Sequence, residues 1–318
     1  MGHLFLVMKV ALLDNFHPSI NDTLKKWGWD IINAQSWQVN DFQKLSYDLD
    51  GLFIRSRIPL NKELLRNAKK LKFIARPGAG LENIDLKYCE ENNIDVFRSP
   101  EGNRDAVAEH TLGMILMLLN NLKFADHEVR SGIWNRESNR GYELMGKTFA
   151  IIGYGFMGKA LAKRLVGFGV NVIAYDKYLS NFHSDLVKEV SLDEVYQTAD
   201  FVSLHTPLNQ DTIGLVNEKF INKFNKPFYL INTARGKSVV LKDLAYALEK
   251  GLVLGACLDV LEFESSSFEN FSYNKHPYFN EISRMKNVVF SPHIAGWTFE
   301  SKEKMAFFLL NKLKQKYL

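Results

Sequence analysis

Three polar positions in the C-terminal half of the sequence could do chemistry, because each follows an apolar run of strand length. They are Arg235, an acid within residues 259–264, and His293. A guanidinium can hold a carboxylate through two hydrogen bonds, and a histidine beside an acid can move a proton near neutral pH. Ligands of open α/β sheets bind at the carboxyl ends of the strands, so we expect these groups to converge on one crevice.

A glycine-rich turn, GYGFMG at residues 153–158, lies between a predicted strand and a predicted helix. Gly153 would permit the tight turn, Gly155 would let a pyrophosphate approach the backbone, and Gly158 would let the helix pack on the strand. Free N–H groups and the positive dipole at the start of the helix favour phosphates. In this context the turn indicates a dinucleotide site.

An acidic residue, Asp176, ends the next predicted strand, 18 positions after Gly158. Its carboxylate would accept hydrogen bonds from the adenosine ribose and repel a 2′-phosphate, which favours NAD over NADP. Lys177 follows directly and could weaken this preference by pairing with a phosphate. NADP is therefore the less favoured cofactor, not an excluded one.

Apolar runs of strand length alternate with helix-like segments along the whole chain, which predicts parallel sheets covered by helices. In the first part these runs lie at residues 8–13, 51–55, 73–75 and 94–97. A long apolar helix is predicted at 107–123, and we interpret it as a bridge between two domains. Six strands of a doubly wound sheet are predicted after it, at residues 148–152, 170–175, 201–204, 228–231, 254–258 and 288–290. A last helix at 300–318 would return to the first domain.

The composition is that of an ordinary globular protein, with 318 residues, 46% hydrophobic and 24% charged, enough for two domains. The net charge of +4 is scattered along the chain, so no nucleic-acid partner is expected. Two distant cysteines give no metal-binding spacing, and no metal is expected. No apolar run approaches ~18 residues and no signal peptide is recognisable, so we expect no membrane contact and a cytoplasmic location.

Several further motifs occur in a fixed order along the chain. They are GAGLENID at 78–85, GN at 102–103, VAEH at 107–110, HTP at 205–207, NTARG at 232–236, LDV at 258–260 and SPH at 291–293. With the glycine turn, they resemble the D-isomer-specific 2-hydroxyacid dehydrogenases, most of all the phosphoglycerate and glycerate/hydroxypyruvate branch. The resemblance implies an α/β fold with two Rossmann-like domains. A doubly wound parallel-sheet NAD-binding domain, residues 103–296, would be inserted into a flavodoxin-like substrate domain, residues 1–102 and 297–318.

The resemblance also implies a catalytic trio. Arg235 matches the substrate arginine of the family, His293 its acid/base, and Glu264, 29 residues after the arginine, its glutamate. The glutamate would orient the imidazole and stabilise its protonated form. Serines follow Glu264 where the family usually has a proline, so Glu262 stays open as the alternative, as does the role of residues 265–285.

Other roles are carried over from the family by position. The implied cofactor contacts are Val107, Gly153, Gly155, Phe156, Met157, Gly158, Asp176, Thr206, Pro207, Thr233, Ala234, Asp259 and Gly296. The implied substrate contacts are Arg55, Ser56, Gly78, Ala79, Gly80 and Arg235. Arg57 and Arg76 add positive charge near the same motifs and favour an anionic substrate. His110 and His205 are interpreted as structural.

These features predict reversible hydride transfer between NAD(H) and a small anionic 2-hydroxy or 2-keto acid, with D-3-phosphoglycerate as the leading substrate. The alternatives are a glyoxylate/hydroxypyruvate reductase and a non-catalytic NADH-sensing protein on the same fold. The helix predicted at 107–123, with Trp134 and Tyr142 beyond it, is more apolar than a monomer surface would tolerate, and the family resemblance implies a homodimer through the cofactor domain. No serine-sensing regulatory domain is expected after residue 318.

Overall fold

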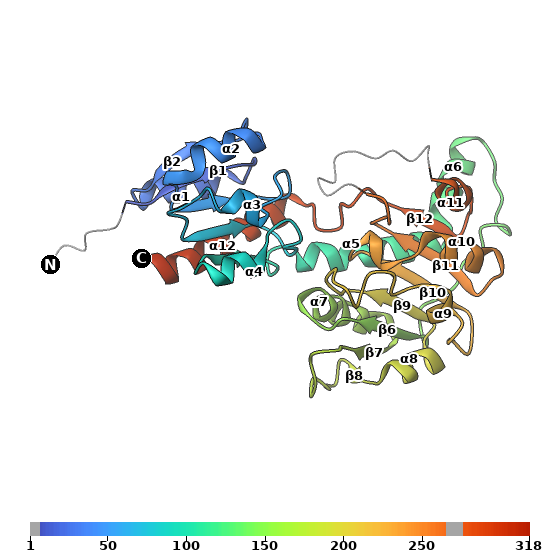
Figure 1. Cartoon of the computed structure of the whole chain (residues 1–318). Helices are drawn as coiled ribbons and strands as arrows, with labels where there is room; N and C mark the ends of the chain where they lie inside the picture. Colours follow the sequence, from blue (N-terminus) through green and yellow to red (C-terminus); the bar gives the residue numbers. More distant parts are fainter. Residues whose placement is uncertain (1–6, 265–275) are drawn as a thin grey trace. The chain divides into compact units, whose positions relative to one another are not determined.

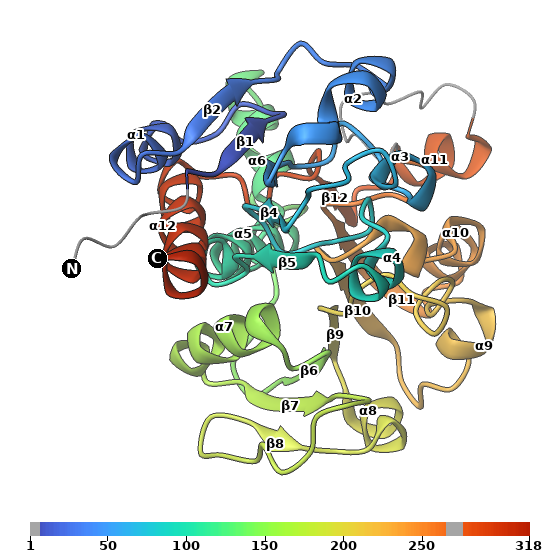
Figure 2. The same cartoon turned by 60° about the vertical axis from the view of Figure 1, so that its left-hand side comes forward.

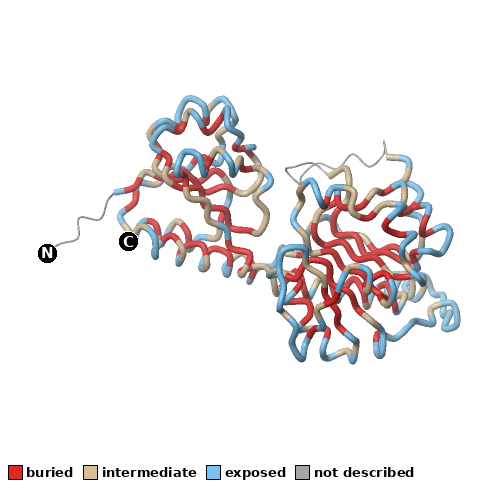
Figure 3. The backbone as a smooth tube through the Cα atoms, turned by 60° about the horizontal axis from the view of Figure 1, so that its bottom comes forward, coloured by how far each residue is buried: buried red, intermediate tan, exposed pale blue. Residues whose placement is uncertain are grey.

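The computed structural model describes residues 7–264 and 276–318, and these fall into two compact units. Unit 1 comprises residues 7–103 and 297–318 of the described chain, and unit 2 comprises residues 104–264 and 276–296. Each unit is a parallel sheet with helices on both faces (Figure 1). Figure 3 shows that burial is concentrated in the strands of each sheet, as expected where both faces are covered.

Unit 1 is built on a five-stranded sheet of order β2-β1-β3-β4-β5. All of its strand pairs are parallel, and the order is the flavodoxin-like one. The strands are β1 (Lys9–Leu12), β2 (Asp30–Asn33), β3 (Gly51–Phe53), β4 (Phe73–Arg76) and β5 (Asp95–Arg98). The helices are α1 (Pro18–Lys26), α2 (Val39–Leu45), α3 (Lys62–Leu65), α4 (Leu86–Glu91) and α12 (Phe299–Tyr317).

Alternation of side chains along the strands gives unit 1 two cores, one on each face of its sheet. On β1, Val10 packs in the core formed with α1 and α12, whereas Ala11 packs in the core formed with α2, α3 and α4. Helix α12 contacts α1 and β5, so the last helix returns to the first sheet as predicted (Figure 2). An ion pair between Lys312 Nζ and Glu101 Oε1, at 2.8 Å, joins this helix to the chain that follows β5.

Unit 2 is built on a seven-stranded parallel sheet of order β12-β11-β10-β9-β6-β7-β8. This is the doubly wound Rossmann order with one strand added, and its switch point lies between β6 and β9. The strands are β6 (Thr148–Ile152), β7 (Asn171–Tyr175), β8 (Lys188–Glu189), β9 (Phe201–Leu204), β10 (Phe228–Asn232), β11 (Val253–Leu258) and β12 (Val288–Phe290). The helices are α5 (Arg104–Leu119), α6 (Leu122–Arg130), α7 (Phe156–Leu165), α8 (Leu192–Thr198), α9 (Glu218–Ile221), α10 (Leu241–Glu249) and α11 (Pro277–Ile282).

The helices of unit 2 are divided between the two faces of its sheet. Helices α5 and α7 share one core with Phe149 and Ile151 of β6, and α8 to α11 share the other with Ala150 and Ile152. The period of two along β6 therefore fixes which residues meet which helices.

Two sequence-based expectations about this unit are wrong. The sheet has seven strands, not six, because the short edge strand β8 was missed. The helix predicted at 107–123 is not a bridge: α5 ends at Leu119, and Asn121, at φ 52°, precedes a second helix, α6. Both helices belong to unit 2 alone. No helix within the two described segments is long and apolar enough to cross a membrane.

Candidate active site

The glycine turn between β6 and α7 has the shape that a bound pyrophosphate needs. Gly153 has φ +97°, and a Cβ there would lie 2.8 Å from the carbonyl of His205. A Cβ on Gly158 would lie 2.3 Å from Gly153 O, so helix and turn touch only because this residue is glycine. At Gly155 a Cβ would meet nothing within 4 Å, which leaves open space over the N-terminus of α7.

Two further observations fit a dinucleotide at this turn. Thr206 Oγ1, in the loop after β9, is buried and has no hydrogen-bond partner among residues 7–264 and 276–318. Asp176, at the end of β7, accepts hydrogen bonds from the backbone N–H of Tyr154 at 2.7 Å, Tyr178 at 2.9 Å and Leu179 at 3.0 Å. The carboxylate is thus held beside the glycine turn, where it retains lone pairs for ribose hydroxyls. The residues present fit NAD.

Lys177 forms an ion pair with Asp211. Its Nζ lies 2.7 Å from Asp211 Oδ2, and the same carboxylate oxygen accepts a hydrogen bond from the Tyr178 hydroxyl at 3.1 Å. Asp211 therefore compensates the positive charge that the sequence suggested for a 2′-phosphate.

His293 and Glu264 form a hydrogen-bonded pair at the carboxyl edge of the sheet. The Nδ1 atom of His293 lies 2.9 Å from Glu264 Oε2, and both side chains are largely enclosed. A carboxylate can only accept, so the pair assigns a hydrogen to Nδ1. Glu262 points elsewhere: its Oε2 accepts the Leu241 N–H at 2.9 Å, at the start of α10. The structure thus pairs Glu264, and not Glu262, with the histidine.

The backbone of His293 is in the left-handed region, at φ 56°. A non-glycine residue holds this conformation only when its surroundings fix it. Asp259 does so: its carbonyl accepts the His293 N–H at 2.7 Å, and its carboxylate accepts from Ile294 N and Ala295 N, each at 2.9 Å. From the sequence, Asp259 was expected as a cofactor contact and lay within the range of the candidate acid, and this clamping role was missed.

Two polar neighbours complete the surroundings of Asp259. The Ser291 hydroxyl donates to Asp259 Oδ1 at 2.6 Å and lies 2.8 Å from His110 Nε2. Burial alone would raise the pKa of Asp259, but hydrogen bonds from His110, Ser291 and the two backbone N–H groups hold it below its ordinary value. The residue therefore stays a carboxylate although it is 2% exposed.

Arg235 lies in a tight turn after β10. Buried Asn232 shapes this turn, because its Nδ2 donates to Arg235 O at 2.9 Å and its Oδ1 accepts from Ala234 N at 3.1 Å. The Arg235 guanidinium itself donates to Ala234 O at 2.6 Å through Nη1. A Cβ on Gly236 would lie 1.9 Å from Leu261 O, so the turn packs directly against the loop that carries Glu264. Arg235, Glu264 and His293 thus follow the adjacent strands β10, β11 and β12.

The two other histidines of interest have structural surroundings. His205 is hydrogen-bonded to Ser203 at 2.9 Å, and burial lowers its pKa to about 4, so it is neutral at pH 7. His110 is the Ser291 partner described above.

In unit 1, the candidate substrate residues occupy the loops after β3 and β4. The Arg55 guanidinium carbon lies 4.0 Å from the centre of the Trp297 ring. Arg76 is buried; its Nε donates to Arg55 O at 2.8 Å and its Nη1 donates to Gly80 O. Arg57 donates to the carbonyls of Trp37 and Leu13. Arg57 and Arg76 therefore brace these loops through backbone carbonyls.

Comparison with known proteins decides the family. Residues 112–295, more than half of the chain, match the family model of the D-isomer specific 2-hydroxyacid dehydrogenase, NAD binding domain, and the described part of this range lies in unit 2. The chain belongs to the D-isomer-specific 2-hydroxyacid dehydrogenase family. It is therefore an NAD-dependent oxidoreductase of 2-hydroxy acids, as the sequence motifs predicted.

Relatives of this dehydrogenase differ in their substrates. The chain is 32% identical over 311 residues to the hydroxypyruvate reductase of Thermotoga maritima, covering 94% of this chain and 97% of the relative. It is 34% identical over 279 residues to the D-3-phosphoglycerate dehydrogenase of Bacillus subtilis, covering 87% of this chain and 51% of the relative. The chain thus spans about half the length of that relative. The D-lactate dehydrogenase of Aquifex aeolicus, solved with NAD and lactic acid, is 29% identical, with a TM-score of 0.81 and coverage of 97% and 95%.

Proposed function

We propose that this dehydrogenase interconverts a small anionic 2-keto acid and its D-2-hydroxy acid with Arg235, Glu264 and His293 as its catalytic machinery. The observation that carries the proposal is the His293–Glu264 pair at 2.9 Å, at the carboxyl edge of the NAD-binding sheet. Such a pair is a common way to fix the tautomer and orientation of an acid/base histidine.

The cofactor would be held by the residues around the glycine turn. Gly155 and the N-terminus of α7 would receive the pyrophosphate, Thr206 would donate through its hydroxyl, and Asp176 would accept from the ribose hydroxyls. When bound, NADH supplies the hydride. Unit 2 would thus be the cofactor domain, and unit 1 the substrate domain.

Proton transfer would run through His293. In the reductive direction its Nε2 would donate a proton to the keto oxygen, and in the oxidative direction Nε2 would accept the hydroxyl proton. Glu264, accepting from Nδ1, would stabilise the imidazolium that forms or is consumed. Arg235 would hold the substrate carboxylate and polarise the neighbouring carbonyl, because its planar donors match a carboxylate.

The substrate is proposed to carry a second anionic group, with 3-phosphohydroxypyruvate as the first candidate. In unit 1, the substrate would be contacted by Arg55, Ser56 and the backbone of residues 78–80. The similarity to phosphoglycerate dehydrogenase and hydroxypyruvate reductase supports this range of acids. Hydroxypyruvate and glyoxylate are the second candidates.

The deciding experiment is a panel of 2-keto acids assayed for NADH and NADPH oxidation. We expect clear turnover with NADH and at least one anionic keto acid. His293→Ala should lower kcat by roughly 10²–10⁴-fold, as for loss of a general acid, with NADH binding retained. Absence of turnover with tight NADH binding would instead favour a cofactor-sensing protein, and full activity in His293→Ala would remove this residue from the mechanism.

A further inference from the structure

Unit 1 contains a cavity of about 300 Å³ at the carboxyl edge of its own sheet. Its walls come from the loop after β1 at residues 15–17, Arg55 after β3, Pro77 after β4, and the start of α12. Ligand sites of open α/β sheets occupy this edge, and the volume suits a small organic acid.

The cavity has the electrostatics of an anion site. Among residues 7–264 and 276–318, its lining includes Arg55 and Lys302 and no aspartate or glutamate. The N-terminal turn of α12, a helix of 19 residues, contributes Phe299 and Ser301 to the wall, so the positive end of its dipole faces the same space. The positive charge of Lys302 and the dipole of α12 therefore favour an anion at the same place as the charge of Arg55 does.

Trp297 is the unusual member of this wall. It is 60% exposed, so burial in the core does not account for its position, yet the Arg55 guanidinium carbon lies 4.0 Å from its ring centre. At that distance the indole attracts the cation through its π face. Stacking covers the flat face of the guanidinium and leaves the N–H edge as the group that meets an anion.

The backbone of Arg55 is also fixed. Its N–H donates to Asp14 Oδ2 at 2.6 Å, and its carbonyl accepts from Arg76 Nε at 2.8 Å and Asn83 Nδ2 at 3.1 Å. The main chain of Arg55 is thus held at both ends, and the contact with the indole restricts the orientation of its side chain as well.

We infer that Trp297 is a positioning residue that holds the Arg55 guanidinium as the receptor for the distal phosphate or carboxylate of the 2-keto acid. This inference rests on the proposed function. It makes Trp297 a determinant of substrate choice: it favours acids with a second anionic group over acids without one.

The test compares 3-phosphohydroxypyruvate, 2-oxoglutarate and glyoxylate as substrates of the wild type, Trp297→Ala and Trp297→Phe. The preferred acid with a second anionic group is whichever of 3-phosphohydroxypyruvate and 2-oxoglutarate the wild type uses better. For this acid, Trp297→Ala should raise KM at least tenfold and keep kcat within threefold of the wild type. For glyoxylate, KM and kcat should both change less than threefold. Trp297→Phe should restore most of the loss, because phenylalanine also has a π face. The acid whose KM rises more in Trp297→Ala shows whether phosphate or carboxylate is the distal group that Arg55 receives.

Two further variants separate positioning from general damage. Arg55→Lys keeps the positive charge but loses the planar group that stacks on the indole, so its KM values should change as those of Trp297→Ala do. This variant tests the same contact without removing Trp297, in case Trp297→Ala folds poorly. The double variant Arg55→Ala/Trp297→Ala should be no worse than Arg55→Ala alone, since the tryptophan acts through the arginine. Phe307→Ala, on an exposed part of the same helix, is the matched control and should change none of the ratios.

The outcomes distinguish the inference from the proposed function. Equal losses for glyoxylate and the dianionic acids in Trp297→Ala, or additive losses in the double variant, would overturn the inference and leave the enzyme assignment intact. If no keto acid is reduced, the proposed function fails. Calorimetric titration of the full chain with 3-phosphoglycerate then decides: binding at least tenfold weaker in Trp297→Ala supports the anion receptor, and equal binding refutes it.

Discussion

Glu262 and Glu264 show how two identical side chains, two positions apart, receive different tasks from the fold. The turn after β11 directs Glu264 to His293 Nδ1, at 2.9 Å, and Glu262 to the Leu241 N–H, also at 2.9 Å. The first contact orients an acid/base group, while the second satisfies a free donor at the start of α10. The spacing typical of the family favoured Glu264, but both positions lie on the same short loop, so the sequence left Glu262 open as the alternative.

We expect Glu264→Gln to lower kcat and Glu262→Gln to lower stability instead. A glutamine at 264 keeps the shape but cannot compensate a charged imidazole, so kcat should fall by about 10²-fold, within the range for acid–base groups. A glutamine at 262 should leave kcat within twofold and lower the free energy of unfolding by about 1 kcal/mol, as for a weakened helix cap. Steady-state kinetics and urea unfolding of both variants provide the measurement. Similar kcat losses in the two variants would contradict the assignment.

Asp211 gives a second prediction at this scale, concerning the cofactor. Its ion pair with Lys177, at 2.7 Å, lies next to Asp176, the proposed ribose acceptor. In Asp211→Asn, Lys177 loses its counter-charge and a nearby negative charge disappears, so kcat/KM for NADPH should rise by about three- to fivefold, the scale of an exposed pair. The value for NADH should stay within twofold.

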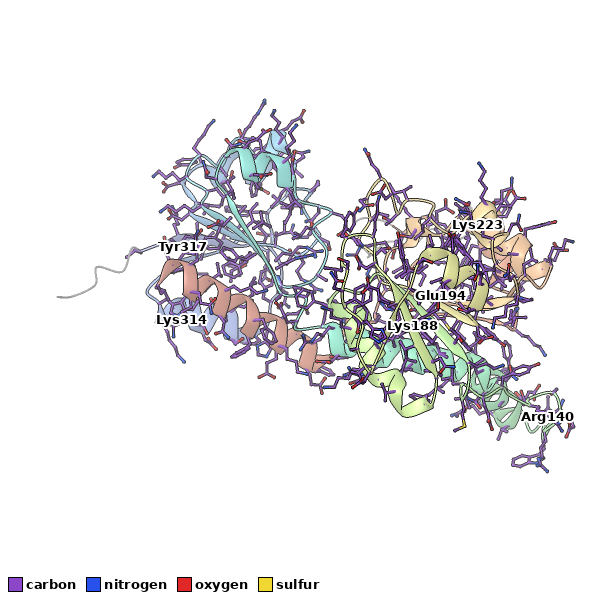
Figure 4. The ribbon with its side chains drawn as sticks, turned by 90° about the horizontal axis from the view of Figure 1, so that it is seen from below. Arg140, Lys188, Glu194, Lys223, Lys314 and Tyr317 are labelled. Carbon is purple, nitrogen blue, oxygen red and sulfur yellow. The ribbon has the colours of Figure 1, made fainter. Side chains whose placement is uncertain are left out.

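The matched control for this prediction is another exposed pair on unit 2. Lys188 Nζ of β8 and Glu194 Oε1 of α8 lie 2.6 Å apart (Figure 4). Glu194→Gln removes the same charge and should leave the NADPH to NADH ratio of kcat/KM unchanged. An equal rise in both variants would point to net charge and not to Lys177.

Among the elements, the buried strands were predictable from the sequence, and so were the edge strands β5 and β12, whereas the edge strands β2 and β8 were missed. Predicted residues 148–152 and 201–204 coincide with β6 and β9, which are continuous apolar runs. Strand β2 was missed because its burial is only partial and alternates weakly, and β8 because two residues carry no pattern. The break between α5 and α6 depends on Asn121 in the left-handed region, which apolar periodicity does not reveal.

The site residues follow the same logic. A polar residue after a buried strand can be placed at the sheet edge from sequence, and this held for Arg235 and His293. The clamp by Asp259 depends on three hydrogen bonds from the backbone N–H groups of His293, Ile294 and Ala295, so no side-chain pattern in the sequence predicts it. The cation–π contact of Trp297 joins positions 242 residues apart and was likewise outside the reach of spacing.

Strand β9 carries a prediction about pH, because His205 continues it against the glycine turn. The His205 N–H donates to Ile152 O at 2.8 Å, and burial lowers the pKa of the ring to about 4, against about 6.5 in an unfolded chain. Between these values the unfolded chain binds a proton that the folded chain does not. Stability should therefore fall as the pH drops from 6.5 toward 4, by at most about 3 kcal/mol from this group.

Urea unfolding at pH 7.5, 5.5 and 4.5 measures this contribution. His205→Gln keeps a polar side chain that does not titrate, so its free energy of unfolding should lose less on acidification than that of the wild type. The difference between the two proteins should narrow toward pH 4.5. Parallel curves would show that His205 does not control stability in this window.

At the scale of the whole molecule, unit 2 presents an apolar surface that its own fold leaves uncovered. Helix α6 is amphipathic, yet none of its residues is buried. Exposed apolar side chains gather on it and on the segment that follows, namely Leu122, Val129, Ile133, Trp134, Tyr142 and Met145. Exposed apolar side chains concentrated in one segment of a chain commonly mark a protein interface, and a second copy of the chain is the partner we propose.

We therefore expect a homodimer whose interface includes α6. Light scattering coupled to gel filtration should give twice the mass of the 36.5 kDa chain at micromolar concentration. Val129→Asp, which places a charge where the interface would bury it, should shift the mass toward the monomer, since an unpaired buried charge is costly. Phe307→Asp changes an equally exposed aromatic residue in unit 1 and should leave the dimer intact. A monomeric wild type would contradict the proposed dimer. A dimer that survives Val129→Asp and dissociates in Phe307→Asp would place the interface elsewhere.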